Sequence, residues 1–132
     1  MKSGTITVKT SSQLELVDIT SVLQQELAGS SVQQGILFIY NPHTTAAITI
    51  NEGADPAVRH DIVAALRRIV PFELAYKHME GNSPAHVMSS LVGASETVFV
   101  EAGHMKLGTW QKIFFCEFDG PRTRKVHWHI ME

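Results

Sequence analysis

The sequence predicts an α+β fold: a single compact domain, residues 1–132, with mixed or antiparallel β layers arranged like a sandwich and about three short helices. Three observations lead to this class. Short runs of strand-forming residues alternate with turn residues, which is typical of antiparallel or mixed sheets. Three stretches between these runs carry helix starts or helical spacing. The chain is 44% hydrophobic, enough for one core, and no repeat or linker divides it.

The N-terminal part predicts a strand and a helix. Residues 5–9 alternate between polar and apolar side chains, and residues 13–17 either continue that strand or pair with it. A helix follows, in which residues 22–27 carry the apolar stripe and Gly29 is the expected stop. Its start has three candidate caps, namely Asp18, Thr20 and Ser21.

Residues 36–50 predict a hairpin. The run 36–40, ILFIY, is almost continuously apolar and indicates a central strand covered on both faces. Asn41 and Pro42 break this strand, and residues 46–50 begin the second one. The connection between the two strands carries His43, Thr44 and Thr45.

Two further helices begin at proline. The first starts at the Asp-Pro pair 55–56 and keeps helical spacing until Pro71. The second runs from Pro84 to about residue 91, with Ser83 as its cap and Gly93 as its end.

Three strands complete the chain, at residues 97–101, 107–118 and 123–131. In the last strand, Val126, Trp128 and Ile130 share one face, whereas His127 and His129 share the other. A terminal strand with a polar outer face explains these two histidines more simply than a metal chelate.

Charge and hydropathy exclude several classes of partner. The formal net charge is −2 and the pI is near 6.4, so the chain lacks the basic surface that binding to nucleic acid needs. No apolar run approaches the roughly 20 residues of a membrane helix, and the N-terminus is unlike a secretory signal. We expect a cytoplasmic protein with no membrane partner. Cys116 is alone among phenylalanines, which excludes an internal disulfide and predicts a buried, inert thiol.

Residues 76–93, YKHMEGNSPAHVMSSLVG, hold the densest group of reactive side chains. His78 and Glu80 point the same way if the approach to the turn is extended. His86 falls in the first turn of the predicted helix, where free backbone N–H groups favour a neutral imidazole and any nearby anion. A neutral imidazole can bind a metal ion. The segment therefore predicts part of a metal or phosphate site.

The other histidines differ in their surroundings. His43 lies in a connection between strands, and loops held by rigid strands commonly carry binding groups. His60 is expected on the solvated face of its helix, and His104 in a turn.

A second polar group combines GTWQ (108–111) with DGPR (119–122). Arg122 emerges from a turn, and its planar guanidinium suits a phosphate or carboxylate. The alternative is structural, with Trp110 in the core and Arg122 paired with Glu117 or Asp119, and spacing alone leaves both open. The Gly-rich phosphate loops, the G-x-S-x-G elbow and H-E-x-x-H are absent from the sequence.

Together these motifs resemble the YjbQ-like family, whose members carry the label secondary thiamine-phosphate synthase. The resemblance spans nearly the whole chain and rests on five motifs in order: HTTAAITINE (43–52), the Asp-Pro pair (55–56), HMEGNSPAHVMSSLVG (78–93), LGTWQ (107–111) and CEFDGPR (116–122). It implies a layered α+β domain assembled as a homotrimer, with sites near the subunit interfaces. The chain departs from the family pattern at His104, where a basic residue is expected.

The resemblance also implies a set of recurrent polar positions, matched here by His43, Asn51, Glu52, His78, Asn82, His86, Gly108, Thr109, Trp110, Gln111 and Arg122. From these positions and the helix start we predict the site residues. The catalytic set is His43, His78, His86 and Glu52, and the same three histidines are the predicted metal ligands. The set that binds the substrate or anion is Asn51, Asn82, Ser83, Thr109, Gln111 and Arg122.

The leading functional hypothesis is an enzyme with a phosphate and metal site for a small phosphorylated substrate or anion. The family label implies thiamine-phosphate synthesis, which joins an aminopyrimidine-methyl diphosphate to a thiazole phosphate and releases diphosphate. That reaction typically uses Mg²⁺ with Arg or Lys, whereas three imidazoles favour zinc, so the expected cofactor is a divalent metal, Zn or Mg. The alternatives are a metal-dependent hydrolase of a small phosphorylated metabolite and a non-catalytic trimer that binds an anionic metabolite.

Overall fold

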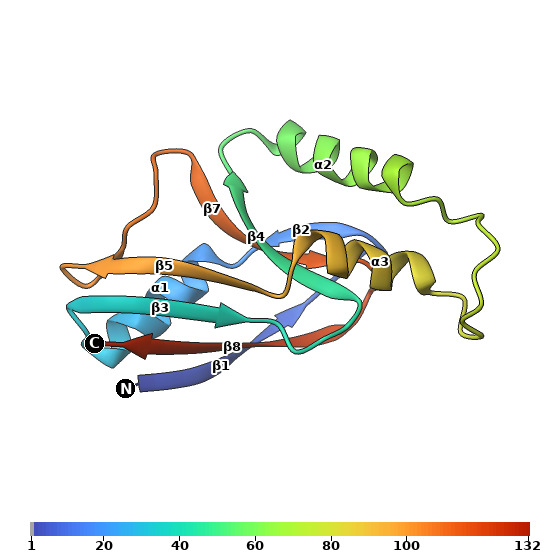
Figure 1. The fold of residues 1–132 in the computed structure, drawn as a ribbon. Helices are drawn as coiled ribbons and strands as arrows, with labels where there is room; N and C mark the ends of the chain where they lie inside the picture. Colours follow the sequence, from blue (N-terminus) through green and yellow to red (C-terminus); the bar gives the residue numbers. More distant parts are fainter. Residues whose placement is uncertain (1) are drawn as a thin grey trace.

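The computed structural model describes residues 2–132, which form two antiparallel sheets and three helices (Figure 1). The five-stranded sheet runs in the order β1 (Lys2–Lys9), β8 (Thr123–Met131), β3 (Gln34–Tyr40), β5 (Ser95–Glu101) and β6 (His104–Met105). The three-stranded sheet runs in the order β2 (Glu15–Asp18), β7 (Gln111–Glu117) and β4 (Ala46–Glu52). All the strand pairs of this part of the chain are antiparallel, and the predicted α+β class is confirmed.

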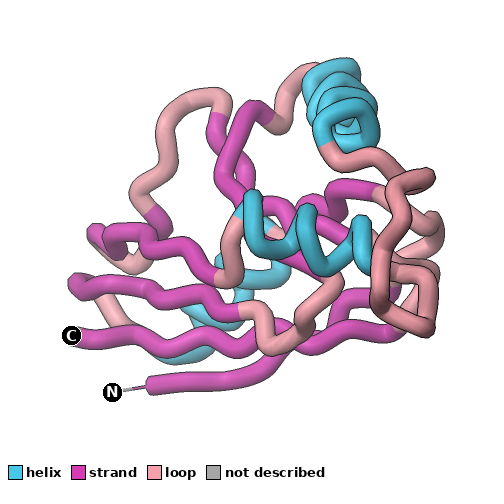
Figure 2. Tube along the Cα trace, turned by 45° about the vertical axis from the view of Figure 1, so that its right-hand side comes forward, coloured by secondary structure: helices cyan, strands magenta, loops and turns pink. Residues whose placement is uncertain are grey.

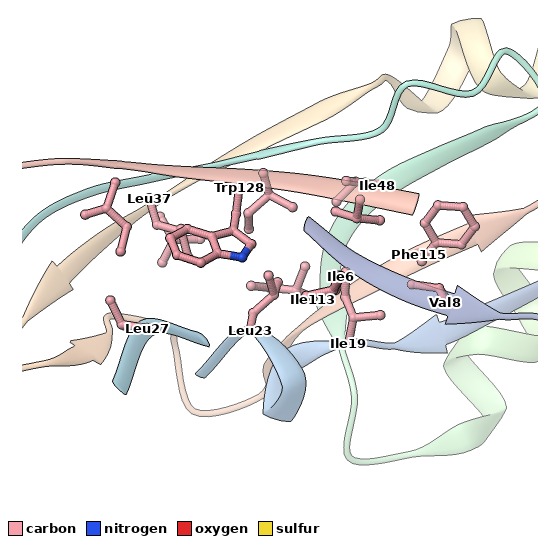
Figure 3. Close-up of a cluster of buried hydrophobic side chains, with 14 of the residues drawn as sticks. Ile6, Val8, Ile19, Leu23, Leu27, Leu37, Ile48, Ile113, Phe115 and Trp128 are labelled. Carbon is pink, nitrogen blue, oxygen red and sulfur yellow. The ribbon is translucent and has the colours of Figure 1, made fainter. Parts of the chain in front are cut away.

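The main hydrophobic core lies between the two sheets and is closed by α1 (Thr20–Ser30) (Figure 3). Leu37 and Trp128 come from the five-stranded sheet, Ile48 and Phe115 from the three-stranded sheet, and Leu23 from α1. Full burial of such side chains contributes about 1.5–3 kcal/mol each. The strand pattern that predicts Val126, Trp128 and Ile130 on one face is confirmed, since all three are buried.

A second core covers the opposite face of the three-stranded sheet, where α3 (Ser83–Val92) packs (Figure 2). Phe114, Cys116 and Phe118 of the sheet side contact Ala85 and Met88 of the helix. Burial raises the pKa of the Cys116 thiol to about 12, so the predicted inert thiol is confirmed. α2 (Pro56–Ile69) lies further out and has no fully buried residue.

The outer face of the five-stranded sheet is uncovered in the chain. β3 is an interior strand of its sheet, as predicted, because it pairs with both β5 and β8. Leu37 and Ile39 face the core, whereas Phe38 is 39% and Tyr40 is 52% exposed. The expectation that this strand is covered on both faces is therefore wrong for the single chain.

The predicted hairpin over residues 36–50 is also wrong. β3 and β4 are consecutive but belong to different sheets, and β4 pairs with β7 instead. The reason is the Asn41 side chain: it accepts a hydrogen bond from the His43 N–H (3.0 Å) and donates to the carbonyl oxygens of His43 (3.0 Å) and Ala46 (2.9 Å). These bonds hold the chain in a bend that carries it from one sheet to the other.

The helix ends confirm some sequence signals and correct others. Asp55 caps α2 by accepting a hydrogen bond from the Ala57 N–H at 2.9 Å, as predicted. The N-cap of α3 is Asn82 and not Ser83, and neither the caps nor the first turn of this helix contains an acid. α1 continues past Gly29 to Ser30, and its C-cap Ser31 adopts the left-handed conformation with φ +62°.

Two strand predictions also need correction. The last-but-one strand begins at Gln111 rather than at residue 107, and His104 lies in the short strand β6 rather than in a turn. None of the helices in residues 2–132 is long and apolar enough to cross a membrane.

A buried ion pair joins the strand ends next to the second core. Arg124 of β8 donates from Nε to Oε1 of Glu117 at 2.9 Å, and its Nη2 donates to Oε2 of the same carboxylate. Thr10 donates to Glu117 (2.7 Å), and Arg124 donates to the hydroxyl of Thr45 (2.9 Å). Burial alone raises the pKa of Glu117, but the hydrogen bonds from Arg124 and Thr10 outweigh burial and lower it, so the carboxylate stays charged.

Replacing Glu117 with Leu is expected to destabilise the protein by about 3–5 kcal/mol, because it leaves the Arg124 guanidinium buried without a countercharge. Urea unfolding followed by circular dichroism measures this loss. The double variant Glu117→Leu with Arg124→Leu is the matched control and is expected to be more stable than the single variant. A single variant within about 1 kcal/mol of wild type contradicts the role of the pair.

Candidate functional site

Three separated segments meet at one pocket of about 440 Å³, which we call the histidine pocket. The connection after β3 contributes His43, the turn before α3 and its first turns contribute His78 and His86, and the connection before β8 contributes Arg122. Its other lining residues are Pro42, Thr44, Thr45, Glu80, Asn82, Asp119 and Arg124. Five of the residues predicted from the sequence therefore lie around one cavity.

His43 is fixed by the backbone of β8. Its Nε2 accepts a hydrogen bond from the Lys125 N–H at 2.9 Å, and its ring packs edge-on against Phe115 at 6.5 Å between centroids. Burial lowers the pKa of His43, and the nearby Arg124 guanidinium lowers it further. A neutral imidazole whose Nε2 accepts carries its proton on Nδ1. His43 is thus a neutral ring with one N–H left to donate.

His78 and His86 form a pair. Their rings meet edge to face, with centroids 5.3 Å apart and an angle of 87° between the planes. Gly81 makes the turn between them possible, because its φ of +78° is a left-handed conformation that glycine adopts without strain. The turn predicted at Gly81 and Asn82 is confirmed. It places the imidazoles of His78 and His86, which lie on either side of the turn in the sequence, on the same wall of the pocket.

Arg122 is held by Asp119 at the rim of the pocket. Its Nε donates to the Asp119 carbonyl oxygen at 2.7 Å and its Nη2 to the carboxylate at 3.0 Å. Asn82 donates to the same carboxylate at 2.9 Å, which ties the start of α3 to this turn. Of the two partners predicted for a structural ion pair, Asp119 is the correct one. The side chain of Arg122 remains 52% exposed, so it can also contact a ligand.

The charges around the histidine pocket nearly balance. Asp119 pairs with Arg122 and the buried Glu117 pairs with Arg124, and Glu80 is the other carboxylate among the lining residues. An anion therefore depends on N–H donors as well as on the exposed guanidinium group of Arg122. α3 supplies one such donor, the Ser83 N–H, because its N-cap makes no side-chain hydrogen bond, Pro84 has no N–H, and the Ala85 N–H donates to the Asn82 carbonyl oxygen at 3.0 Å.

The remaining predicted residues lie elsewhere in the chain. Asn51 and Glu52 end β4, and the step of six residues from Ala46 to Glu52 corresponds to about 20 Å of strand. Glu52 pairs in register with Gln111, and Thr109 lies in the loop before that strand. Their side chains serve local turns: Glu52 accepts from the Asp55 N–H (3.1 Å), and Gln111 accepts from the Gly108 N–H (2.8 Å).

The histidine pocket therefore lacks four of the predicted residues within one chain: Asn51, Glu52, Thr109 and Gln111. Ser83 begins α3 beside the pocket without lining it. Trp110, for which a core position is the structural alternative, is 63% exposed. His60 is exposed on α2, as expected.

The arrangement does not form a three-histidine metal site. Within residues 2–132, no group of three or more His, Cys, Asp or Glu side chains is close enough to hold a metal ion. His43 gives the reason, because one ring nitrogen accepts from Lys125 and the other carries the proton. His78 and His86 remain as two candidate ligands, and metal binding stays a prediction.

Sequence reasoning missed Arg124, which lines the pocket, and its pairing with Glu117, which the sequence suggests only as a partner of Arg122. A signal for Arg124 exists, because it shares the phase of Val126 and Trp128 on the inward face of β8. Glu117 interrupts the apolar run from Ile113 to Phe118, which is the pattern of a buried acid. A charge within an inward-facing series indicates a buried partner of opposite charge.

The lowered pKa of His43 predicts a pH effect on stability. Because the folded state favours the neutral ring, the unfolded chain binds more protons below the ordinary pKa of 6.5. The contribution of His43 is thus present above that value and is lost as the pH falls through the lower folded pKa. Between about pH 7.5 and about pH 5.5, wild type should lose more free energy of unfolding than His43→Gln.

Urea unfolding at several pH values measures this difference, with His60→Gln as a control at an exposed histidine. The control should follow wild type. Equal pH dependence in wild type and His43→Gln contradicts the assignment of a neutral His43.

The family model described as "UPF0047 protein YjbQ-like" matches residues 4–132. A UPF0047 protein of Methanocaldococcus jannaschii is 52% identical over 124 residues, covering 94% of this chain and 90% of that protein. The UPF0047 protein YugU of Bacillus subtilis is 48% identical over 128 residues, covering 96% of this chain and 97% of that protein.

Solved structures agree. A crystal structure of a YjbQ/UPF0047 family protein from Clostridium acetobutylicum is 47% identical, covers 96% of this chain and 98% of its own, and superposes with a TM-score of 0.93. A hypothetical protein from Aeropyrum pernix K1 is 38% identical, covers 99% of this chain and 98% of its own, and superposes with a TM-score of 0.94. From the sequence match and the shared fold, the chain belongs to the YjbQ-like UPF0047 protein family.

Proposed function

We propose that the protein is an enzyme that hydrolyses a small phosphorylated metabolite in the histidine pocket. The observation that carries the proposal is the meeting of His43, His78, His86 and Arg122, from three separated segments, around one cavity of about 440 Å³. Cavities of this size suit small ligands, and imidazoles are the commonest proton-transfer groups at neutral pH.

The phosphate group has three kinds of donor in this pocket. The exposed guanidinium of Arg122 retains N–H groups that Asp119 does not use. The start of α3 presents the Ser83 N–H and the positive end of the helix dipole. His43 adds a neutral N–H donor at a fixed position. These donors stabilise the negative charge of a phosphate. They are needed because the charged side chains of the pocket are paired with one another and supply no net positive charge.

The chemistry needs one proton acceptor and one proton donor. Water attacks phosphorus, the ester P–O bond breaks, and the organic group leaves as an alcohol. In the proposed reaction, one ring of the His78 and His86 pair takes a proton from the water, and the other gives a proton to the leaving oxygen. A group that transfers protons in this way contributes about 10²–10⁴-fold to the rate.

Thiamine-phosphate synthesis, the reaction implied by the family label, is the narrower proposal for the same pocket. It also requires bound phosphate groups, but a magnesium diphosphate site is usually built from several free carboxylates. The carboxylates that line the described pocket are Glu80 and Asp119, and Asp119 already binds Arg122 and Asn82. This difference favours hydrolysis. Binding of Zn²⁺ or Mg²⁺ remains a prediction for metal analysis of the purified protein.

Alanine variants of the pocket residues test the proposed function. Release of inorganic phosphate from a panel of phosphorylated metabolites should fall about 10²–10⁴-fold in kcat for His78→Ala and His86→Ala. Arg122→Ala should mainly raise KM, because it removes a phosphate contact. His60→Ala, an exposed histidine of α2, is the control and should match wild type. Activity that survives the combined change of His43, His78 and His86 contradicts a catalytic pocket.

We further propose that the chain assembles as a homotrimer in the cytoplasm, as the family resemblance implies. The uncovered face of the five-stranded sheet supports assembly, because Phe38, Phe99 and Met131 are exposed on it. Contiguous apolar patches of this kind commonly mark interfaces between proteins.

Light scattering after gel filtration tests the assembly. Wild type should have three times the mass of the 14.6 kDa chain. Phe38→Asp should lower that mass, because it buries a carboxylate in the interface. Val22→Asp replaces another exposed apolar residue, on α1, and should leave the mass unchanged. A monomeric wild type, or a trimeric Phe38→Asp variant, contradicts this interface.

A further inference from the structure

A second hollow, of about 520 Å³, lies next to the histidine pocket. The two share Pro42, His43, Thr44 and His86, so two of the three histidines line both. We call it the Tyr40 hollow, since Tyr40 at the end of β3 forms one side of it. The other side is the end of α3 and the step to β5, with Ser90 and Gly93.

The walls of the Tyr40 hollow are held by hydrogen bonds within the fold. Ser89 donates to the Ala46 carbonyl oxygen at 2.6 Å, and the Ile48 N–H donates to the Gly93 carbonyl oxygen at 3.1 Å. The Asn41 N–H donates to the Ala94 carbonyl oxygen at 2.8 Å. These bonds tie α3 and β5 to the ends of β3 and β4. The shape of the hollow is therefore fixed by hydrogen-bonded segments at the place where the two sheets meet.

The chemistry of the two cavities differs. The histidine pocket contains both arginines and both carboxylates, whereas Asp, Glu, Lys and Arg do not line the Tyr40 hollow as described. Its available groups include the half-exposed Tyr40 ring and the hydroxyls of Thr44 and Ser90, whereas the Asn41 amide and Ser89 are already engaged. A hydrogen atom replaces a side chain at Gly93, and a Cβ built there meets no atom within 4 Å.

From this contrast we infer the class of substrate: a phosphomonoester whose organic group is an uncharged ring, with the phosphate in the histidine pocket and the ring in the Tyr40 hollow. The inference rests on the proposed function, since it requires phosphate in the first cavity. The scissile ester oxygen then lies near His43 and His86, the two histidines common to both cavities. The Tyr40 ring offers a face for stacking, and Ser90 offers a hydroxyl for a polar substituent.

Titration calorimetry with four probes tests this division. The probes are inorganic phosphate, methyl phosphate, phenyl phosphate and ribose 5-phosphate. Wild type should bind at least one ring-containing ester about tenfold or more tighter than methyl phosphate, because only the ring esters reach the second cavity. A preference for phenyl phosphate indicates an aromatic ring, and a preference for ribose 5-phosphate indicates a sugar.

The variant Ser90→Trp fills the Tyr40 hollow, and Leu91→Trp is the matched control. Leu91 is the next residue of α3, is 58% exposed and lies outside the lining of both cavities. Ser90→Trp should remove the preference for ring esters and leave binding of inorganic phosphate within about twofold. Leu91→Trp should bind all four probes like wild type. Tyr40→Ala should weaken only the ring esters, and Tyr40→Phe should restore them if the ring is what binds.

The outcomes separate the two proposals. If wild type binds inorganic phosphate but does not prefer ring esters, or if Ser90→Trp keeps the preference, the Tyr40 hollow is not part of the substrate site and the proposed function stands. If wild type fails to bind inorganic phosphate, both proposals are overturned. Equal losses for all probes in Ser90→Trp also overturn the inference, because they indicate damage to the phosphate site.

Discussion

The buried ion pair between Arg124 and Glu117 is the interaction on which the site depends most. It joins β8 to the end of β7, and through Thr10 and Thr45 it reaches the end of β1 and the start of β4. The same strand ends carry the histidine pocket: Thr45 and Arg124 line it directly. A buried pair contributes little net free energy of folding compared with an apolar replacement. Its main effect here is to hold the strand ends in fixed positions. It fixes where the two sheets part and hence where a polar cavity opens.

The division into two sheets also decides which residues can act together. β4 separates the predicted site into two groups, because His43 precedes it and Glu52 ends it. Residues 43–52 form a continuous motif in the sequence, but a straight strand places the two ends of this motif far apart in space. The groups that do meet come from turns: the bend at Asn41, the turn at Gly81 and the turn at Asp119. The pocket is assembled from turns around a rigid frame.

Features that depend on neighbouring residues could be predicted from the sequence. Features that depend on residues distant in the sequence could not. The cap at Asp55, the turn at Gly81 and the alternation of β8 depend on neighbouring residues, so the sequence contains their cause. The pairing of β4 with β7 depends on the competition among all strands, and the apolar pattern of residues 36–50 fits a hairpin equally well. The meeting of His43 with His86 followed from the family resemblance and not from spacing. The lowered pKa of His43 depends on burial and on the Arg124 guanidinium, which is distant in sequence.

The hydrogen bond from Lys125 to His43 makes one wall of the histidine pocket more rigid than the other. One wall, with His43, is anchored to β8 and to the Asn41 bend. The opposite wall follows the stretch from Pro71 to Gly81, in which nearly every residue is exposed. Exposed stretches with few packed neighbours open at low free-energy cost, whereas central strands open only near global unfolding. Adaptation to differently shaped ligands is therefore confined to the side of His78, and amide exchange rates should differ sharply between the two sides of one small cavity.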